Sequence, residues 1–153
     1  MVQSVECRLS EHGDLTARVK FQNSGLSPAR RLRWLYKARL VVIHGEGQRH
    51  SLTLGGEPDL EKSHWRQDIP SAESWTSPPL ALPQRNAPEV IASIRQSAFI
   101  AVTVRIVADY QDVFGTTHQE VACFQGRVEP RPDDAYAGLE RAHDGVLDEW
   151  PGK

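Results

Sequence analysis

Apolar and polar residues alternate over most of the first 128 positions, which is typical of β-strands with one buried face. The longest regular stretch covers residues 99–110, and its apolar face is formed by Ile100, Val102, Val104, Ile106, Ala108 and Tyr110. Residues 112–115 predict a tight turn, because Gly115 readily adopts the positive φ that hairpins need. A second strand is expected from about Thr117, with either Cys123 or Phe124 facing the core beside Val104.

The N-terminal part of the chain predicts another hairpin. Residues 5–9 and 15–21 alternate in the same way, and residues 11–13 between them end in a glycine, which a three-residue hairpin turn favours. The next segment, residues 23–29, contains Asn, Gly and Pro and therefore predicts a corner rather than a strand.

Residues 28–43 are compatible with a strand or a helix. In a strand, one face would carry Leu32, Trp34, Tyr36, Ala38, Leu40 and Val42. In a helix, Leu32, Leu35, Tyr36 and Arg39 would form a stripe beside a basic surface. We favour a strand, because β-branched residues close the run and a proline-containing turn opens it. Sixteen residues exceed the usual strand length, so we expect a bend, a bulge or a change of sheet near Ala38.

The middle of the chain predicts shorter elements. Residues 44–48 read as a hairpin loop that returns through residues 50–54, and a short strand is expected at 63–69. Five prolines between positions 70 and 88 exclude a helix there and leave at most an edge strand around residues 80–82. Asn86 is then expected to cap a short helix whose apolar side carries Val90, Ile91 and Ile94.

Two turn motifs carry a resemblance to a known group of domains. They are NSGLSPA at residues 23–29 and YQDVFG at residues 110–115. Together they resemble uncharacterised bacterial immunoglobulin-like domains, which have an N-x-G-x-(S/T)-P-A corner after an early strand and a Y-x-D-x-(F/Y)-G turn between the last two strands. The resemblance covers most of residues 1–128 in strand order. It implies a fold and hardly a function, because both motifs are turn chemistry.

We therefore expect an all-β chain: an immunoglobulin-like antiparallel β-sandwich of about seven strands with one short helix, over residues 1–128. Residues 129–153 hold seven acidic and three basic residues, and we expect an acidic tail that is partly helical or flexible. Asp133 or Asp134 would cap its helix, which would reach about His143.

The expected location is cytoplasmic, unless the sequence was excised from a longer membrane-anchored protein. No secretion signal is visible at the N-terminus, and no apolar run approaches the roughly 20 residues that cross a bilayer. Members of the immunoglobulin-like group often follow one or two membrane helices, which this sequence lacks.

No motif predicts catalysis. The six histidines lack the spacing of a zinc site, and neither a nucleophile elbow nor a phosphate-binding loop is present. Asp109, Asp112 and His118 could meet at one hairpin end, but a turn aspartate more often accepts backbone donors. Cys7 and Cys123 both take apolar-facing positions; a bridge is conceivable, and two free thiols are favoured. We expect no enzyme activity, no cofactor and no metal site.

A row of basic residues is the strongest unusual feature. Arg31, Arg33, Lys37 and Arg39 would project from one strand face, and Arg105 joins them if that strand pairs with residues 100–110. Such a row is able to bind phosphates, anionic lipid or an acidic protein surface. The simpler interpretation is a solvated sheet face neutralised by neighbours such as Asp109 and Glu120. A formal net charge of −2 counts against nucleic acid.

The best functional hypothesis is a non-catalytic protein-interaction module of a bacterial protein. The alternative is a binder of anionic ligands or membrane headgroups through the basic row, which the acidic tail is also expected to cover weakly. Trp34 is expected in the core, whereas Trp65, Trp75 and Trp150 lie in irregular segments and are candidate interface anchors.

Overall fold

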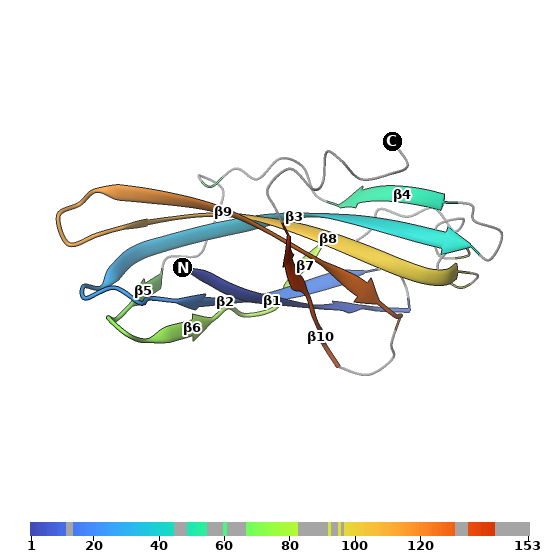
Figure 1. The fold of residues 1–153 in the computed structure, drawn as a ribbon, viewed down its shortest axis with the longest axis horizontal. Helices are drawn as coiled ribbons and strands as arrows, with labels where there is room; N and C mark the ends of the chain where they lie inside the picture. Colours follow the sequence, from blue (N-terminus) through green and yellow to red (C-terminus); the bar gives the residue numbers. More distant parts are fainter. Residues whose placement is uncertain are drawn as a thin grey trace.

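The chain forms two antiparallel β-sheets packed face to face, as in a β-sandwich (Figure 1). The computed structural model describes residues 1–11, 14–44, 49–54, 67–82, 97–130 and 135–142, together with Leu60, Ala92 and Arg95. Within these residues there are eleven strands, of which six have six or more residues and five have two or three. The all-β prediction is confirmed, and the number of strands exceeds the expected seven because the short strands carry too few residues to show alternation.

The first sheet has the order β10–β1–β2–β6, and β7 also pairs with β2. Its strands are β1 (Val2–Leu9), β2 (Leu15–Gln22), β6 (Ser74–Thr76), β7 (Leu80–Leu82) and β10 (Ala137–Gly138). The predicted N-terminal hairpin is confirmed, because β1 and β2 pair antiparallel with Leu9 opposite Leu15. The last two residues of its predicted turn, residues 12–13, lie outside the described residues.

The second sheet has the order β11–β9–β8–β3–β4, and β5 pairs with the start of β3. Its strands are β3 (Ala29–His44), β4 (Arg49–Leu54), β5 (Gln67–Ile69), β8 (Ser97–Gln111), β9 (Thr117–Val128) and β11 (Glu140–Ala142). β8 is central and pairs with β3 on one side and with β9 on the other along almost its whole length. It is therefore the strand that aligns the rest of this sheet.

The predicted strand over residues 28–43 is confirmed as β3, and its predicted core face is buried. Leu32, Trp34, Ala38 and Leu40 are all inaccessible to solvent. The predicted irregularity exists, but its predicted position near Ala38 is wrong, because the register with β8 shifts between Arg30 and Arg33. Ala29 and Leu32 are both buried although they lie three positions apart, which would place them on opposite faces of a regular strand. A bulge between them turns both Arg30 and Arg31 outward and returns Leu32 to the core face. The partner strand does change at Ala38, where pairing with β4 begins.

The core lies between the two sheets and is rich in aromatic residues. The Trp34 ring lies 5.9 Å from the Phe21 ring and 6.2 Å from the Tyr36 ring. Trp75 stacks on Phe21 at 6.0 Å and packs against the core, whereas Trp65 and Trp150 lie outside the described residues. Aromatic pairs at these distances add to the stabilisation from buried area.

The register of β9 places Phe124 opposite Val104 in the core. Cys123 is buried on the other face of the sheet, opposite Arg105. Cys7 is a core residue of β1, so the two cysteines face different environments and both are free thiols. The favoured interpretation of two unbridged thiols is confirmed.

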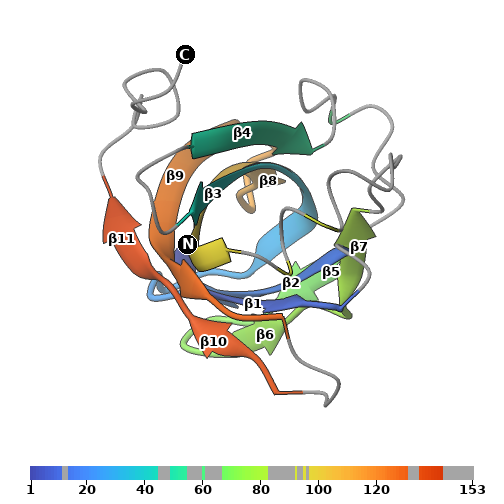
Figure 2. The same ribbon diagram turned by 90° about the vertical axis from the view of Figure 1, so that its right-hand side faces the viewer.

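The helix predicted from Asp133 or Asp134 to about His143 is wrong for residues 137–142, which form β10 and β11. Figure 2 shows this segment crossing one side of the sandwich, from the edge of β1 to the edge of β9. Between the two strands, Leu139 donates its backbone N–H to the Val5 carbonyl and places its side chain in the core. Burial of that leucine and pairing with two open sheet edges outweigh local helix propensity.

The helix predicted after Asn86 lies outside the described residues except for Ala92 and Arg95, which are both exposed. Among the residues that the structure describes, no helix is long and apolar enough to cross a membrane. The cytoplasmic location stays a prediction.

Candidate interaction surface at the loop end

Three connections leave the sandwich at the same end. Arg30 pairs with Gln111, so the β2–β3 connection (residues 23–28) and the β8–β9 turn (residues 112–116) start side by side. The β5–β6 connection (residues 70–73) joins them, because the Asn23 backbone N–H bonds to the Glu73 carbonyl at 2.9 Å. We call these three connections the loop end; it lies on the left in Figure 1.

The loop end carries exposed apolar side chains. Leu26 is 100% exposed, Phe114 is 89% exposed and Val113 is 39% exposed. Among the described residues, these three are the large hydrophobic side chains that are exposed. An isolated surface leucine needs no explanation, but three exposed apolar side chains on two neighbouring loops make this end of the molecule a candidate contact surface.

The β2–β3 connection is held in place by the side chain of Asn23, which is 6% exposed. Its Nδ2 donates to the carbonyls of Ser27 at 2.8 Å and Ile69 at 3.0 Å, and its Oδ1 accepts the backbone N–H of Gly25 at 3.0 Å. The Ser71 hydroxyl donates to the Gly25 carbonyl at 2.6 Å. The backbone that carries Leu26 is therefore fixed by hydrogen bonds on both sides, as expected for the predicted corner.

The β8–β9 turn is organised by Asp112. Its Oδ1 accepts the backbone N–H groups of Phe114 at 2.9 Å and Thr116 at 3.0 Å. Gly115 has a φ of +82°, as the turn prediction requires. The turn therefore presents Phe114 on a backbone that the carboxylate has already ordered.

His118 reinforces the same turn from β9. Its Nε2 lies 2.9 Å from Asp112 Oδ2, and its ring stacks on Tyr110 with 5.2 Å between centroids. The hydrogen bond from His118 is the main reason why the pKa of the Asp112 carboxyl lies below its ordinary value, and the backbone N–H groups of Thr116 and Phe114 add to the effect.

The suggested meeting of Asp109, Asp112 and His118 is wrong for Asp109. That carboxylate forms a two-pronged ion pair with the Arg33 guanidinium, with 2.8 Å between Nε and Oδ1. The reason is the register, which places Asp109 directly opposite Arg33. Within the described part of the chain, no group of three or more His, Cys, Asp or Glu side chains is able to hold a metal ion.

A small cavity of about 280 Å³ lies beside the loop end and is lined by Arg31, Arg33, Asp109, Gln111 and Thr117. Arg31 is exposed and sits in the β3 bulge with a φ of +54°, where its backbone N–H bonds to Asp68 Oδ1 at 2.9 Å. Arg33 is neutralised by Asp109, so Arg31 is the exposed positive charge of this cavity.

The predicted basic row is interrupted. The bulge displaces Arg31 from the regular spacing of β3, and Arg33 is paired with Asp109. Further along, Lys37 lies opposite Arg105 as the expected strand pairing requires, but Lys37, Arg39 and Arg105 are all half-buried and none of them is free of partners. The structure therefore brings these five residues onto one sheet without forming an open, continuous positive surface.

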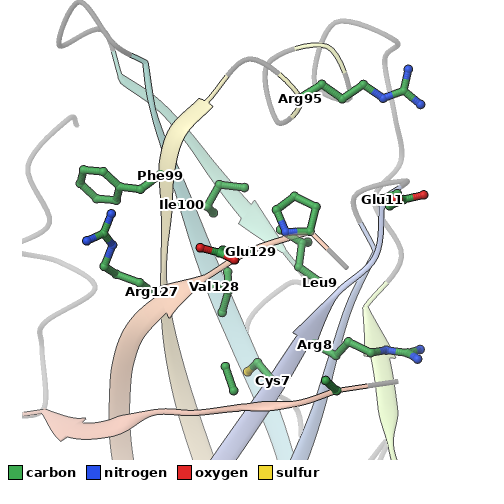
Figure 3. Close-up of a pocket in the computed structure, with 13 residues that line it drawn as sticks. Cys7, Arg8, Leu9, Glu11, Arg95, Phe99, Ile100, Arg127, Val128 and Glu129 are labelled. Carbon is green, nitrogen blue, oxygen red and sulfur yellow. The ribbon is translucent and has the colours of Figure 1, made fainter. Parts of the chain in front are cut away.

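A larger cavity of about 910 Å³ opens at the opposite end of the sandwich (Figure 3). Its lining is Cys7, Arg8, Leu9, Glu11, Arg95, Phe99, Ile100, Arg127, Val128, Glu129, Pro130, Ala135 and Ala137. Arg127 lies over the Phe99 ring at 4.3 Å. Burial, with a smaller effect of Glu6, raises the pKa of the Cys7 thiol to about 12, so this sulfur stays protonated and is a poor nucleophile. The described lining contains no histidine that would serve as its base.

The sequence predicted these loops but not their exposed side chains. Leu26 and Phe114 both lie inside the motifs that predicted a corner and a turn. A large apolar residue within a segment of Asn, Gly, Ser and Pro has no core to pack against, and that mismatch was the available signal.

No family model and no curated protein matches the sequence. One similar solved structure is the X-ray structure of Northeast Structural Genomics Consortium target SoR45, with 11% sequence identity, a TM-score of 0.36, and coverage of 94% of this chain and 93% of that one. Another is Spo0M, a sporulation control protein from Bacillus subtilis, with 12% identity and a TM-score of 0.29. That match covers 86% of this chain and 51% of Spo0M. These values are too low to assign a family or a function.

Proposed function

We propose that this chain is a non-catalytic interaction module that binds a partner protein through its loop end. The observation that carries the proposal is the near-complete exposure of Leu26 and Phe114 on two adjacent loops whose backbones are fixed by hydrogen bonds. Burying a side chain of this size is worth about 1.5–3 kcal/mol. Phe114 belongs to the aromatic residues that are enriched at protein interfaces, and preordered backbones lower the entropy cost of binding.

The charges around these side chains favour a protein over an anionic membrane. Arg30 and Arg31 are exposed at this end, and so are Asp68 and Glu73. An apolar centre with a rim of both signs is the usual composition of a protein–protein interface. An anionic bilayer would favour a predominantly basic rim.

We also propose that the sandwich is of the immunoglobulin type. In immunoglobulin nomenclature, β1, β2 and β6 correspond to strands A, B and E of one sheet, and β9, β8, β3 and β4 to strands G, F, C and C′ of the other. Trp34 takes the position of the buried tryptophan on strand C. In immunoglobulin-like domains, loops at one end of the sandwich commonly bind partners, which supports the assignment of the loop end.

Binding of an anionic ligand is the second candidate, and the small cavity beside Arg31 favours it. The Arg31 guanidinium, the Gln111 amide and the Thr117 hydroxyl offer hydrogen-bond donors of the kind that phosphate needs. Because Asp109 neutralises Arg33, this cavity offers an anion less positive charge than the five-residue basic row that the sequence predicted.

The test begins with the full chain as a tagged bait for cross-linking in cells of the source organism. A captured protein is purified, and its affinity for the full chain is measured by calorimetry. The double variant Leu26→Ser/Phe114→Ser is expected to weaken that affinity by more than about 100-fold, since each anchor is worth about 1.5–3 kcal/mol. The matched control is Arg95→Ser/Glu129→Ser, which changes two residues at the opposite end and should leave the affinity unchanged.

The vesicle experiment separates the two candidates. Sedimentation with phosphatidylglycerol vesicles should show no more binding than with phosphatidylcholine vesicles. If the double variant binds the purified partner as tightly as the control variant does, the proposal is wrong. Binding to phosphatidylglycerol that is lost in Arg31→Ser would support the anionic candidate instead.

A further inference from the structure

One edge of the second sheet is covered over only part of its length. β8 pairs with β9 continuously from Thr117 to Val128, but β11 pairs with the other edge of β9 only from Cys123 to Gln125. In the part of the chain that the structure describes, no strand lies along residues 117–121 on that side. We call residues 117–121 the open edge; in Figure 1 it belongs to the left half of β9.

The open edge has few of the features that normally protect a sheet edge: its one carboxylate, Glu120, points toward the N-terminus, where it binds the Met1 ammonium group and the Val2 backbone N–H. The β8–β9 register has no shift, so no bulge twists the strand away. The sequence of the open edge, THQEV, contains no proline, lysine or arginine. Two strands at the edge of the first sheet, β6 and β10, have only three and two residues. Unprotected edges of this length are templates for pairing with another strand.

The neighbouring edge of β1 is closed in a different way. The Val2 backbone N–H donates to Glu120 Oε2 at 3.1 Å, and the Arg141 guanidinium donates to the Val2 carbonyl. Side chains from β9 and β11 thus satisfy the backbone of β1 at this point. The backbone of the open edge has no such arrangement among the described hydrogen bonds, so its outward N–H and C=O groups are available to a partner strand.

The geometry points to a second copy of this chain as the occupant: we propose that two open edges pair antiparallel about a two-fold axis at Gln119. This register pairs all five residues, with Gln119 opposite Gln119, His118 opposite Glu120 and Thr117 opposite Val121. No like charges face each other in this register. The paired residues end at Val121, just before β11 begins to cover β9 at Cys123, so this register uses the whole length of the open edge.

The resulting dimer joins the two copies of the second sheet into one continuous sheet. Five residue pairs bury a small area, so the association is weak and depends on concentration. The proposal goes beyond the proposed function, because it uses the backbone of β9 and not the side chains of the loop end. The two can therefore fail separately.

Sedimentation velocity of the full chain, from micromolar to millimolar concentrations, tests the proposal. We expect a monomer–dimer equilibrium, and Gln119→Lys should weaken it by about tenfold or more because two lysines then face each other at the axis. Gln125→Lys is the matched control: it is the same substitution at another exposed position of β9, where β11 already pairs, and it should leave the equilibrium unchanged.

Hydrogen exchange locates the contact. The amides of residues 117–121 that point away from β8 should gain protection as the concentration rises, whereas the amides that already bond to β8 should not. A chain that stays monomeric throughout, a dimer that both lysine variants weaken equally, or protection of the outward-pointing amides that does not depend on concentration would overturn the proposal. The last result would mean that another part of the same chain covers the edge. Gln119→Lys should retain affinity for the partner of the loop end.

Discussion

Leu139 and Gly126 offer a direct test of whether the segment after β9 is part of the packed structure. Leu139 is 9% exposed and belongs to the core cluster, although it lies in a region where the sequence predicted an acidic tail. Its Cδ2 atom lies 2.9 Å from the position that a Cβ on Gly126 would occupy. The two residues therefore compete for the same space.

Each single substitution should destabilise the chain. Leu139→Ala removes a buried side chain near the side of the sandwich and should cost about 2–3 kcal/mol. Gly126→Ala gains about 0.5–1 kcal/mol from the lower entropy of the unfolded chain, but it forces the leucine to move, and such overpacking costs about 1–3 kcal/mol. The net cost of Gly126→Ala should be about 1 kcal/mol.

The double variant should be more stable than the sum of the single effects predicts. With Leu139 shortened, the clash disappears, because the other atoms near the new Cβ are both 3.7 Å away, which is an ordinary contact distance. Gly126→Ala should then be neutral or stabilising, and the coupling between the two sites should be about 1–2 kcal/mol.

Urea unfolding followed by tryptophan fluorescence measures all four proteins, with the m-value as a check on the compactness of the unfolded state. Additive effects within about 0.5 kcal/mol would refute the reasoning, since they would mean that Leu139 does not pack against β9.

Three further predictions test the turns and the thiols. Gly115→Val should cost about 1–2 kcal/mol of folding stability in the same urea assay, because Gly115 has a φ of +82° that a β-branched residue resists. Gly138→Val is the control and should cost clearly less, because Gly138 has open space around it and no positive φ. The pKa of Asp112, followed by carboxyl NMR, should lie below its ordinary value and rise in His118→Ala, and an unchanged pKa in the variant would contradict this prediction. Because the pKa of Asp112 is lower in the folded chain, the carboxylate stabilises the fold at pH values above its unfolded pKa. That stabilisation is lost as the pH falls through the folded pKa. Cys7, whose pKa is about 12, should not react with Ellman's reagent at pH 8 until the chain is unfolded, and rapid labelling of the native chain would show that this thiol is not buried.

The long strands could be predicted from the sequence because alternation reports burial directly. Each of the core positions assigned to β3 is buried, and the two hairpins have the predicted partners. The bulge at Arg31 could not be predicted, because it depends on both Ala29 and Leu32 being drawn into the core. The strands β10 and β11 were missed because two or three residues show no periodicity, and their stability comes from edges that the rest of the chain supplies.

The candidate site was predicted only in part. The five basic residues were found from their spacing, but their charges depend on neighbours across the sheet, such as Asp109 opposite Arg33. Sequence spacing along one strand does not give the register with the next one. The turns that carry Leu26 and Phe114 were predicted from local chemistry, whereas their meeting at one end of the molecule depends on the pairing of Arg30 with Gln111.

The segment that crosses from β1 to β9 also has a consequence for synthesis of the chain. Residues 137–142 are made after all the longer strands of the fold, and they pair with strands made at both the beginning and the end of the sandwich. Until they emerge, the edges of β1 and β9 are open together on a nearly complete fold. Neighbouring nascent chains on one messenger RNA are then most able to exchange strands, and the docking of Leu139 ends that interval.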